Sequence, residues 1–247
     1  MRLLLLSNSR NPGGDYLAHA LAEIGDFLGP QPRRVAFVPY AAVTFPYNDY
    51  PHRVAAAFGK LGHSVESLHE GDPAEVLREA DTIVVGGGNT FRLLEILQRS
   101  ELLPRIRKRV KEGTPYIGWS AGSNLACPTI RTTNDMPIVQ PVTLEAMGLI
   151  PFQINPHFTD EVLPNYGGES RAERLAEFLA LNPKLPVAGL REGSWIRREH
   201  GGQLRLGGTA PMTLFRAGQE PAEYVPGADL GFLLHGTTPS GGHRAIG

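Results

Sequence analysis

The sequence predicts an α/β fold of three layers, in which helices cover both faces of a mainly parallel β-sheet. Between Leu3 and Trp119, short apolar runs alternate with longer segments of helical periodicity. Parallel strands need crossover connections, which are usually helices, and strands covered on both faces are apolar throughout. With 41% hydrophobic and 20% charged residues in 247, the chain has the composition of an ordinary globular protein.

The first half of the chain alternates strand and helix in order. Leu3–Leu6 predicts a fully buried strand, and a polar loop separates it from a helical pattern over Tyr16–Leu28. Further strands are expected at Arg34–Pro39, Ser64–Leu68, Thr82–Val85 and Pro115–Trp119. The helices between and after them are expected at Val54–Leu61, Pro73–Ala80, Phe91–Arg99 and Leu103–Glu112.

After Ile150 the pattern predicts two more strands, a helix and a small C-terminal antiparallel hairpin. The strands are Phe152–Ile154 and Val187–Leu190, separated by a helix over Arg171–Leu181; the hairpin joins Ser194–Arg198 to Gln203–Leu206. No segment has the character of a domain linker, so residues 1–235 are predicted to form a single α/β domain. Residues 236–247 are rich in Gly, Ser and Thr and are expected to form a frayed tail.

Charge and cysteine content exclude several classes of function. The chain has 24 Lys and Arg against 25 Asp and Glu, a balance that argues against nucleic acid or an anionic membrane as a partner. Its one cysteine, Cys127, excludes an internal disulfide and any multi-cysteine metal site. The apolar run Leu3–Leu6 is too short for a signal peptide, and no run is long enough to span a membrane. We therefore expect a cytoplasmic protein.

The segment Gly118–Gly122 satisfies the G-x-S-x-G pattern directly after a predicted strand. Its two glycines permit a tight turn that raises the Ser120 hydroxyl above the sheet, and the Ala121 N–H then points to where a substrate oxyanion would form. The alternative is a serine that only begins a helix.

The segment Gly86–Thr90 follows the preceding strand. A dinucleotide-binding loop is excluded, because the third glycine of its pattern would fall on Phe91. Two interpretations stay open: a tight turn capped by Asn89 or Thr90, and a second backbone donor for an oxyanion if this strand lies next to the one before Ser120.

A serine nucleophile needs a base, and the base needs an acid that orients it. Among the eight histidines, His157 follows the apolar run Phe152–Ile154 and so lies at a strand end. Glu192 follows another predicted strand, whereas Asp135 lies in a polar loop. The simpler interpretation is that His157 is a polar loop histidine and that Glu192 and Asp135 are solvated surface carboxylates.

Three blocks together resemble peptidase E, the aspartyl dipeptidase family of cytoplasmic serine peptidases. They are GGGNTF at Gly86–Phe91, the long block at Tyr116–Val139 and INPHF at Ile154–Phe158. The similarity extends from the N-terminal LLLLSNS to Trp195. The resemblance implies a sheet like that of class I glutamine amidotransferases, with serine in place of their cysteine, and removal of an N-terminal aspartate from Asp-Xaa dipeptides.

Carried over residue by residue, the resemblance implies Ser120 as nucleophile, His157 as base and Glu192 as acid. The N–H groups of Gly88 and Ala121 would hold the oxyanion. The sequence contains no H-E-x-x-H motif or clustered metal ligands, so no metal or cofactor is expected.

Binding an aspartate side chain requires a cation, because a buried carboxylate without a partner is costly and arginine offers bidentate geometry. Arg171 and Arg131 are the candidates, and Arg171 is preferred because the residues before it match the family pattern. Asn89, in the Gly-rich block, is a further candidate for substrate binding. The expected partner is a small peptide, and the expected assembly a monomer or homodimer.

Other functions compete with this interpretation. An α/β-hydrolase esterase would need a base after the acid, which leaves His235 or His243. A cyanophycin-type serine dipeptidase would share the fold, and a non-enzymatic domain would bind an anion at Gly86–Thr90. Cys127 could be considered as a cysteine nucleophile. It lies seven residues beyond Ser120, however, and a small core residue is the simpler interpretation.

Overall fold

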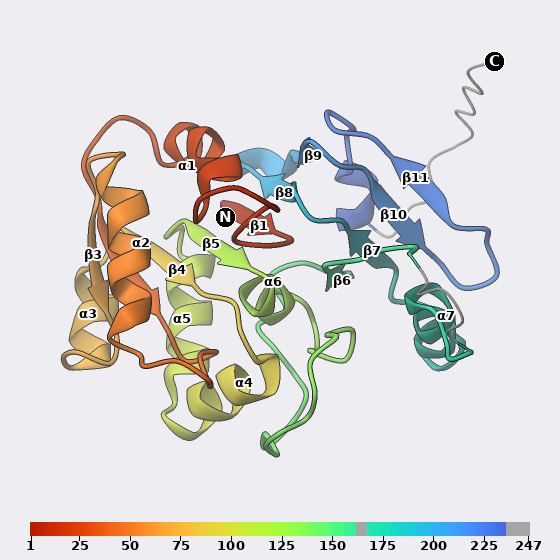
Figure 1. Ribbon diagram of the computed structural model, residues 1–247, viewed down its shortest axis with the longest axis horizontal. Helices are drawn as coiled ribbons and strands as arrows, with labels where there is room; N and C mark the ends of the chain where they lie inside the picture. The colour runs from red at the N-terminus through yellow and green to blue at the C-terminus, as the bar shows by residue number, and fades with distance from the viewer. Residues whose placement is uncertain (162–166, 236–247) are drawn as a thin grey trace.

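The computed structural model describes residues 1–161 and 167–235, which form two β-sheets with helices packed around them (Figure 1). The strands of the first sheet are β1 (Leu3–Leu6), β2 (Arg34–Val38), β3 (Ser64–Ser67), β4 (Thr82–Val85), β5 (Tyr116–Trp119), β8 (Ser194–Arg198) and β9 (Leu204–Gly208). The strands of the second sheet are β6 (Gln153–Pro156), β7 (Val187–Leu190), β10 (Met212–Phe215) and β11 (Ala222–Tyr224).

The first sheet has the order β3-β2-β4-β5-β1-β8-β9. Its five N-terminal strands run parallel, and β8 pairs antiparallel with β1. The predicted hairpin is confirmed, because β8 and β9 pair antiparallel, with Ile196 opposite Leu206. This hairpin extends the edge of the main sheet.

Helices cover both faces of the first sheet, which confirms the predicted three-layer class. Successive residues of β1 point to opposite faces, so Leu4 packs with α1 (Leu21–Leu28) and α2 (Asp49–Gly59). Leu3 and Leu5 pack in the opposite core. The helices that contribute to that core are α3 (Pro73–Glu79), α4 (Thr90–Arg99), α5 (Leu102–Lys111) and α6 (Ala121–Ala126).

The second sheet is the main departure from the expected architecture. β6 and β7 pair parallel with each other and not with the first sheet, and β7 continues antiparallel to β10, which the sequence analysis did not identify. The helix α7 (Arg171–Leu181) covers one face of this sheet. Its other face joins the main core. The hydrophobicity of a short strand shows that it is buried but does not specify its partner, because strand pairing is non-local.

Two helices begin elsewhere than expected. α1 starts at Leu21 after a 3₁₀ turn over Ala18–Ala20, and α2 starts at Asp49, before the predicted Val54. Short 3₁₀ turns also occur at His200–Gly202 and Gly231–Leu234.

The single-domain assignment stays a prediction, and the expected frayed tail at 236–247 lies outside the described residues.

Candidate active site

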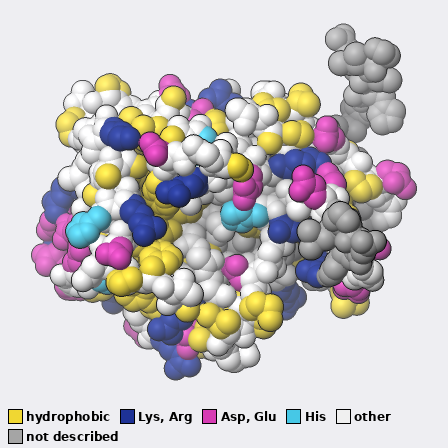
Figure 2. All heavy atoms as spheres, viewed as in Figure 1, with side chains coloured by type: hydrophobic (Ala, Val, Ile, Leu, Met, Phe, Trp, Pro, Cys, Tyr) yellow, Lys and Arg dark blue, Asp and Glu magenta, His cyan; other side chains and the backbone are white. Residues whose placement is uncertain are grey.

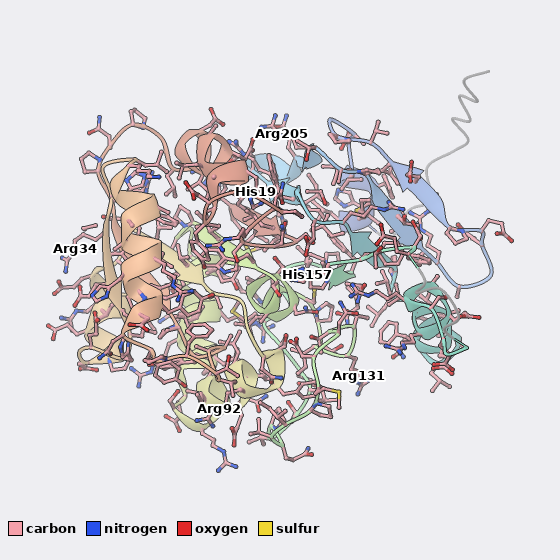
Figure 3. The ribbon with its side chains drawn as sticks, viewed as in Figure 1. His19, Arg34, Arg92, Arg131, His157 and Arg205 are labelled. Atoms are coloured by element: carbon pink, nitrogen blue, oxygen red, sulfur yellow. The ribbon has the colours of Figure 1, made fainter. Side chains whose placement is uncertain are left out.

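The site lies where carboxyl ends of strands from both sheets meet. Ser120 follows β5 of the first sheet, whereas His157 and Glu192 follow β6 and β7 of the second. Figure 3 places His157 near the middle of the molecule, between the two sheets, and at the same position in Figure 2 a histidine side chain reaches the surface. Ligand sites in α/β folds collect at this end of the strands, so the location is typical of the fold.

Ser120 occupies a strained turn between a strand and a helix. Its backbone angles are φ 54° and ψ −112°, a conformation that residues other than glycine rarely adopt. A Cβ at Gly122 would lie 2.3 Å from the Val85 carbonyl oxygen, so only glycine fits against the neighbouring strand. The Ser120 N–H donates to the Leu6 carbonyl at 3.1 Å, which ties the turn to the end of β1. The predicted strand and turn are both present, and α6 follows the turn.

The three side chains Ser120, His157 and Glu192 form one chain of hydrogen bonds. The His157 Nε2 lies 2.9 Å from the Ser120 Oγ, and the His157 Nδ1 lies 2.7 Å from the Glu192 Oε1. A histidine that donates through Nδ1 to a carboxylate leaves Nε2 free to accept the serine proton. The His157 and Glu192 side chains are 35% and 44% exposed, so water reaches this pair.

Asp135, the other candidate acid, has a different set of partners. Its Oδ2 accepts hydrogen bonds from the Thr90 N–H at 2.8 Å, the Thr90 hydroxyl at 2.5 Å and the Thr133 hydroxyl at 2.9 Å. These bonds secure the start of α4 and the loop that carries Asp135. The carboxylate that contacts the ring of His157 is that of Glu192.

Two buried residues after β1, Ser7 and Asn8, form hydrogen bonds with the segments that carry His157 and Glu192. The Ser7 Oγ accepts a hydrogen bond from the His157 N–H at 2.8 Å and donates to the Leu190 carbonyl at 2.7 Å. The Asn8 Oδ1 accepts from the Gly193 N–H at 2.9 Å. His157 has φ 54°, so these contacts stabilise a backbone conformation that is itself unfavourable.

Sequence analysis missed this contribution of Ser7 and Asn8. The signal was available, because both are polar residues directly after a fully apolar strand. Ligand sites in such sheets lie at the carboxyl ends of the strands, and this holds for the first strand as well as for the later ones.

The Gly-rich turn Gly86–Gly88 lies directly beside the nucleophile. β4 and β5 are paired neighbours, which confirms the expected adjacency, and a Cβ at Gly87 would lie 3.0 Å from the Ser120 Cβ. Gly88 has φ +135° and passes so close to Ala41 that a Cβ there would lie 2.2 Å from its carbonyl oxygen. No described residue accepts a hydrogen bond from the Gly88 N–H. The Ala121 N–H opens the first turn of α6, where helix geometry provides no acceptor.

Asn89 caps α4. Its side-chain oxygen accepts from the Arg92 N–H at 3.0 Å, and its amide nitrogen donates to the Met136 carbonyl at 2.9 Å. The capping interpretation of this segment therefore also applies, whereas a contact between Asn89 and substrate stays a prediction.

A pocket of about 460 Å³ opens beside Ser120 and His157. Its wall contains the aromatic side chains of Tyr16, Phe45, Tyr50 and Trp119. The Tyr50 hydroxyl donates to the Gly87 carbonyl at 3.0 Å and accepts from the Trp119 Nε1–H at 3.1 Å. The other described residues along the pocket are Ser9, Arg53, Gly87, Gly88 and Asp135.

The candidate arginines lie in different places around the site. Arg171 begins α7 and is partly buried, and its Nη1 is buried without a hydrogen-bond partner among the described residues. Burial lowers the pKa of the Arg171 guanidinium, nearby Arg174 lowers it further, and the Glu192 carboxylate opposes both. Arg131 is exposed, and in Figure 3 it lies away from His157.

The described lining of the pocket contains neither Arg171 nor Arg131, but it does contain Arg53 of α2. Sequence analysis missed Arg53. The available signal was its position in the segment that follows the carboxyl end of β2.

Other potential reactive groups lie apart from the triad. Burial raises the pKa of the Cys127 thiol to about 12, and its Sγ contacts the Ser123 carbonyl in the core, as a structural cysteine would. His235 lies in a turn after a 3₁₀ segment, and His243 lies outside the described residues. The position of the base beside Ser120 is occupied by His157, which leaves the α/β-hydrolase order without support.

Within residues 1–161 and 167–235, no group of three or more His, Cys, Asp or Glu side chains is arranged to hold a metal ion. Among the helices of those residues, none combines the length and the apolar character that crossing a membrane requires.

Comparisons with known proteins show similarity to peptidases along most of the chain. The family model described as Peptidase family S51 matches residues 3–206. A peptidase E of Nostoc sp. (strain PCC 7120) is 49% identical over 234 residues, which are 94% of this chain and 96% of that relative. A peptidase E of Streptomyces coelicolor is 51% identical over 236 residues, 95% of each chain.

A solved structure of a peptidase from an acI-B1 Actinobacterium has the same fold, with a TM-score of 0.68 at 18% identity. The alignment covers 93% of this chain and 96% of that one. The resemblance to peptidase E that the sequence blocks indicated is confirmed, and the chain belongs to peptidase family S51.

Proposed function

We propose that this S51 peptidase is a serine dipeptidase that removes the N-terminal aspartate of Asp-Xaa dipeptides. The observation that carries the proposal is the continuous chain of hydrogen bonds from Ser120 through His157 to Glu192, with distances of 2.9 and 2.7 Å. The strained turn at Ser120 and the peptidase E relatives at 49 and 51% identity support it.

In the proposed reaction, His157 Nε2 takes the proton of Ser120 as the Oγ attacks the carbonyl carbon of the aspartyl residue. The N–H groups of Gly88 and Ala121 stabilise the negative charge that develops on the carbonyl oxygen. His157 then gives its proton to the departing amine as the C–N bond breaks. A water molecule, deprotonated by His157, attacks the aspartyl ester, and collapse of the second tetrahedral intermediate returns the proton to Ser120 and releases aspartate. Glu192 holds the imidazole in the required tautomer and stabilises the imidazolium.

Arg171 is the proposed cation for the aspartate side chain. Its guanidinium is partly buried, has a nitrogen without a partner among the described residues and lies close enough to Glu192 for the two charges to interact. A guanidinium held in this way can pair with a carboxylate through two parallel hydrogen bonds, and the pairing offsets the cost of removing both charges from water. The proposal extends to a cytoplasmic enzyme without a metal or cofactor, as a monomer or homodimer.

A labelling experiment tests the nucleophile. A serine-reactive phosphonate should add to Ser120, as mass spectrometry of the digested protein would show, and Ser120→Ala should not react. Ser100→Ala changes an exposed serine at the end of α4 and serves as the matched control. Labelling at any other residue, with Ser120 unmodified, would reject the assignment, and the absence of any labelling would favour a non-catalytic binding domain.

A substrate comparison tests the specificity. Asp-Leu should be cleaved far faster than Asn-Leu or simple esters, and Arg171→Met should reduce kcat/KM for Asp-Leu by about 2–5 kcal/mol in transition-state free energy. Equal activity on esters would favour an esterase. Cleavage confined to Asp-Arg dipeptides would favour the cyanophycin-type enzyme, and unchanged Asp-Leu kinetics in Arg171→Met would assign the aspartate to another cation.

A further inference from the structure

The pocket beside Ser120 has a wall of packed aromatic rings. The ring centroids of Tyr16 and Trp119 are 6.0 Å apart and those of Phe45 and Tyr50 are 5.2 Å apart, both in edge-to-face geometry. The hydroxyl of Tyr50 is bonded to the Gly-rich turn, so the wall is connected to the strand end that carries the candidate oxyanion donor. An aromatic wall suits an apolar side chain and does not solvate the carboxylate of an aspartate.

Arg53 is the one Lys or Arg among the described residues that line this pocket. It lies on α2, is exposed, and its Cζ is 5.7 Å from the centre of the Phe45 ring. It forms no ion pair with any described residue. In Figure 2, hydrophobic and basic side chains lie side by side between α2 and the central histidine.

The electrostatics of Tyr50 place the Arg53 charge near the wall. Burial raises the pKa of the Tyr50 hydroxyl, and the positive charge of Arg53 opposes that rise. This agrees with the position of the guanidinium beside the Phe45 ring, in the lining of the pocket. The Asp135 carboxylate in the same lining already has three hydrogen-bond donors, so Arg53 is available for a ligand anion.

Arg53 and Arg171 lie on different elements. Arg53 comes from α2, which covers the first sheet, and Arg171 comes from α7, which covers the second. Figure 1 shows these two helices at opposite ends of the molecule, with the site between them. An Asp-Xaa dipeptide carries one carboxylate on each side of its scissile bond, so it could offer one anion to Arg53 in the pocket and the other to Arg171, which is near enough to Glu192 for their charges to interact.

We infer that Arg53 binds the α-carboxylate of the leaving residue, while the aromatic wall contacts that residue's side chain. The inference rests on the proposed dipeptidase function and deepens it. In a dipeptide the residue after the scissile bond is the last one and carries a free α-carboxylate. In a longer peptide that residue continues into another peptide bond and offers no charge to Arg53, so this contact would select dipeptides. The wall would favour leaving residues with apolar side chains.

The test compares Asp-Leu with its C-terminal amide, Asp-Leu-NH₂, in the wild type and in Arg53→Met. Hydrogen bonds to charged groups contribute enough that wild-type kcat/KM should be about 10- to 100-fold lower for the amide. Arg53→Met should lose a similar factor on Asp-Leu and less than about threefold on the amide, and Arg53→Lys should recover part of the loss. Arg105→Met changes another exposed arginine, on α5, and should leave the ratio of acid to amide unchanged.

Three results would overturn the inference while the proposed function stands. The first is a wild-type enzyme that cleaves the acid and the amide equally well. The second is an Arg53→Met variant that loses the same factor on both substrates. The third is an Arg53→Met variant that no longer distinguishes Asp-Leu from Asn-Leu, because Arg53 would then bind the aspartate side chain. Absence of Asp-Leu hydrolysis in the wild type would reject the proposed function and the inference together.

Discussion

Replacing Glu192 by glutamine tests the catalytic arrangement most directly. The substitution keeps the size of the side chain but removes the negative charge that faces His157 Nδ1 at 2.7 Å. An amide can also donate to Nδ1, which favours the tautomer that cannot accept the Ser120 proton. The folded structure should be little affected, because the Glu192 side chain is 44% exposed.

The size of the effect follows from the environment of the pair. In the transition state His157 becomes an imidazolium, and two unit charges about 4 Å apart interact by about 1 kcal/mol in water and about 4 kcal/mol at an effective dielectric constant of about 20. With side chains 35% and 44% exposed, the pair lies between these limits. Adding the tautomer effect, we expect a loss of about 2–4 kcal/mol, which is about 30- to 1,000-fold in kcat.

Steady-state hydrolysis of Asp-Leu would measure this loss, with thermal unfolding as the test of folding. KM should change little, because Glu192 acts through His157. Glu177→Gln changes an exposed glutamate of α7 and should leave kcat unchanged. A loss of less than about threefold in folded Glu192→Gln would refute the reasoning. So would a larger kcat loss in Asp135→Asn at unchanged Tm, because it would make Asp135 the acid.

Three further predictions concern the nucleophile, the support of the base and an ion cluster. Ser120→Ala should lower kcat by about 10⁴-fold or more with Tm unchanged, and retention of a tenth of the activity would reject Ser120 as the nucleophile. Ser7→Ala leaves the His157 N–H without its acceptor and removes one of the two donors to the Leu190 carbonyl, which keeps the Phe158 N–H, so we expect a loss of about 1–3 kcal/mol in unfolding free energy and about 10- to 100-fold in kcat at similar KM. Ser67→Ala removes another buried hydroxyl, and a similar kcat loss there would show that the effect of Ser7 is only one of stability. Burial raises the pKa of Glu199, but hydrogen bonds from Arg2 and Arg197 outweigh it and hold the pKa below its usual value, so the stability it contributes at neutral pH is lost as the pH falls through that lowered pKa. Glu199→Gln should therefore lower Tm at pH 7 and lower it less below about pH 4, and a Tm difference independent of pH would contradict this.

The sequence by itself determined the fold class, most strands of the main sheet and the three residues that the structure joins in one chain of hydrogen bonds. Local patterns were sufficient for the strands because a run such as Leu3–Leu6 is apolar at every position, as only a strand covered on both faces requires. The pattern around Ser120 was informative because a strand and two glycines together specify a tight turn, and the conformation of Ser120 bears this out. Glu192 could be favoured over Asp135 because carboxyl ends of parallel strands share one edge of a sheet.

The tertiary structure alone decided how strands pair and which polar groups meet. β6 and β7 form a second sheet with β10, although the runs that predicted them, Phe152–Ile154 and Val187–Leu190, do not show which sheet a strand joins. Ser7 contacts His157 across 150 positions of the chain, and no local pattern encodes such a contact. The same holds for Arg53, whose place beside the nucleophile depends on how α2 packs against the first sheet. Hydrophobic periodicity is a property of neighbouring residues, whereas these contacts arise only when distant segments are packed together.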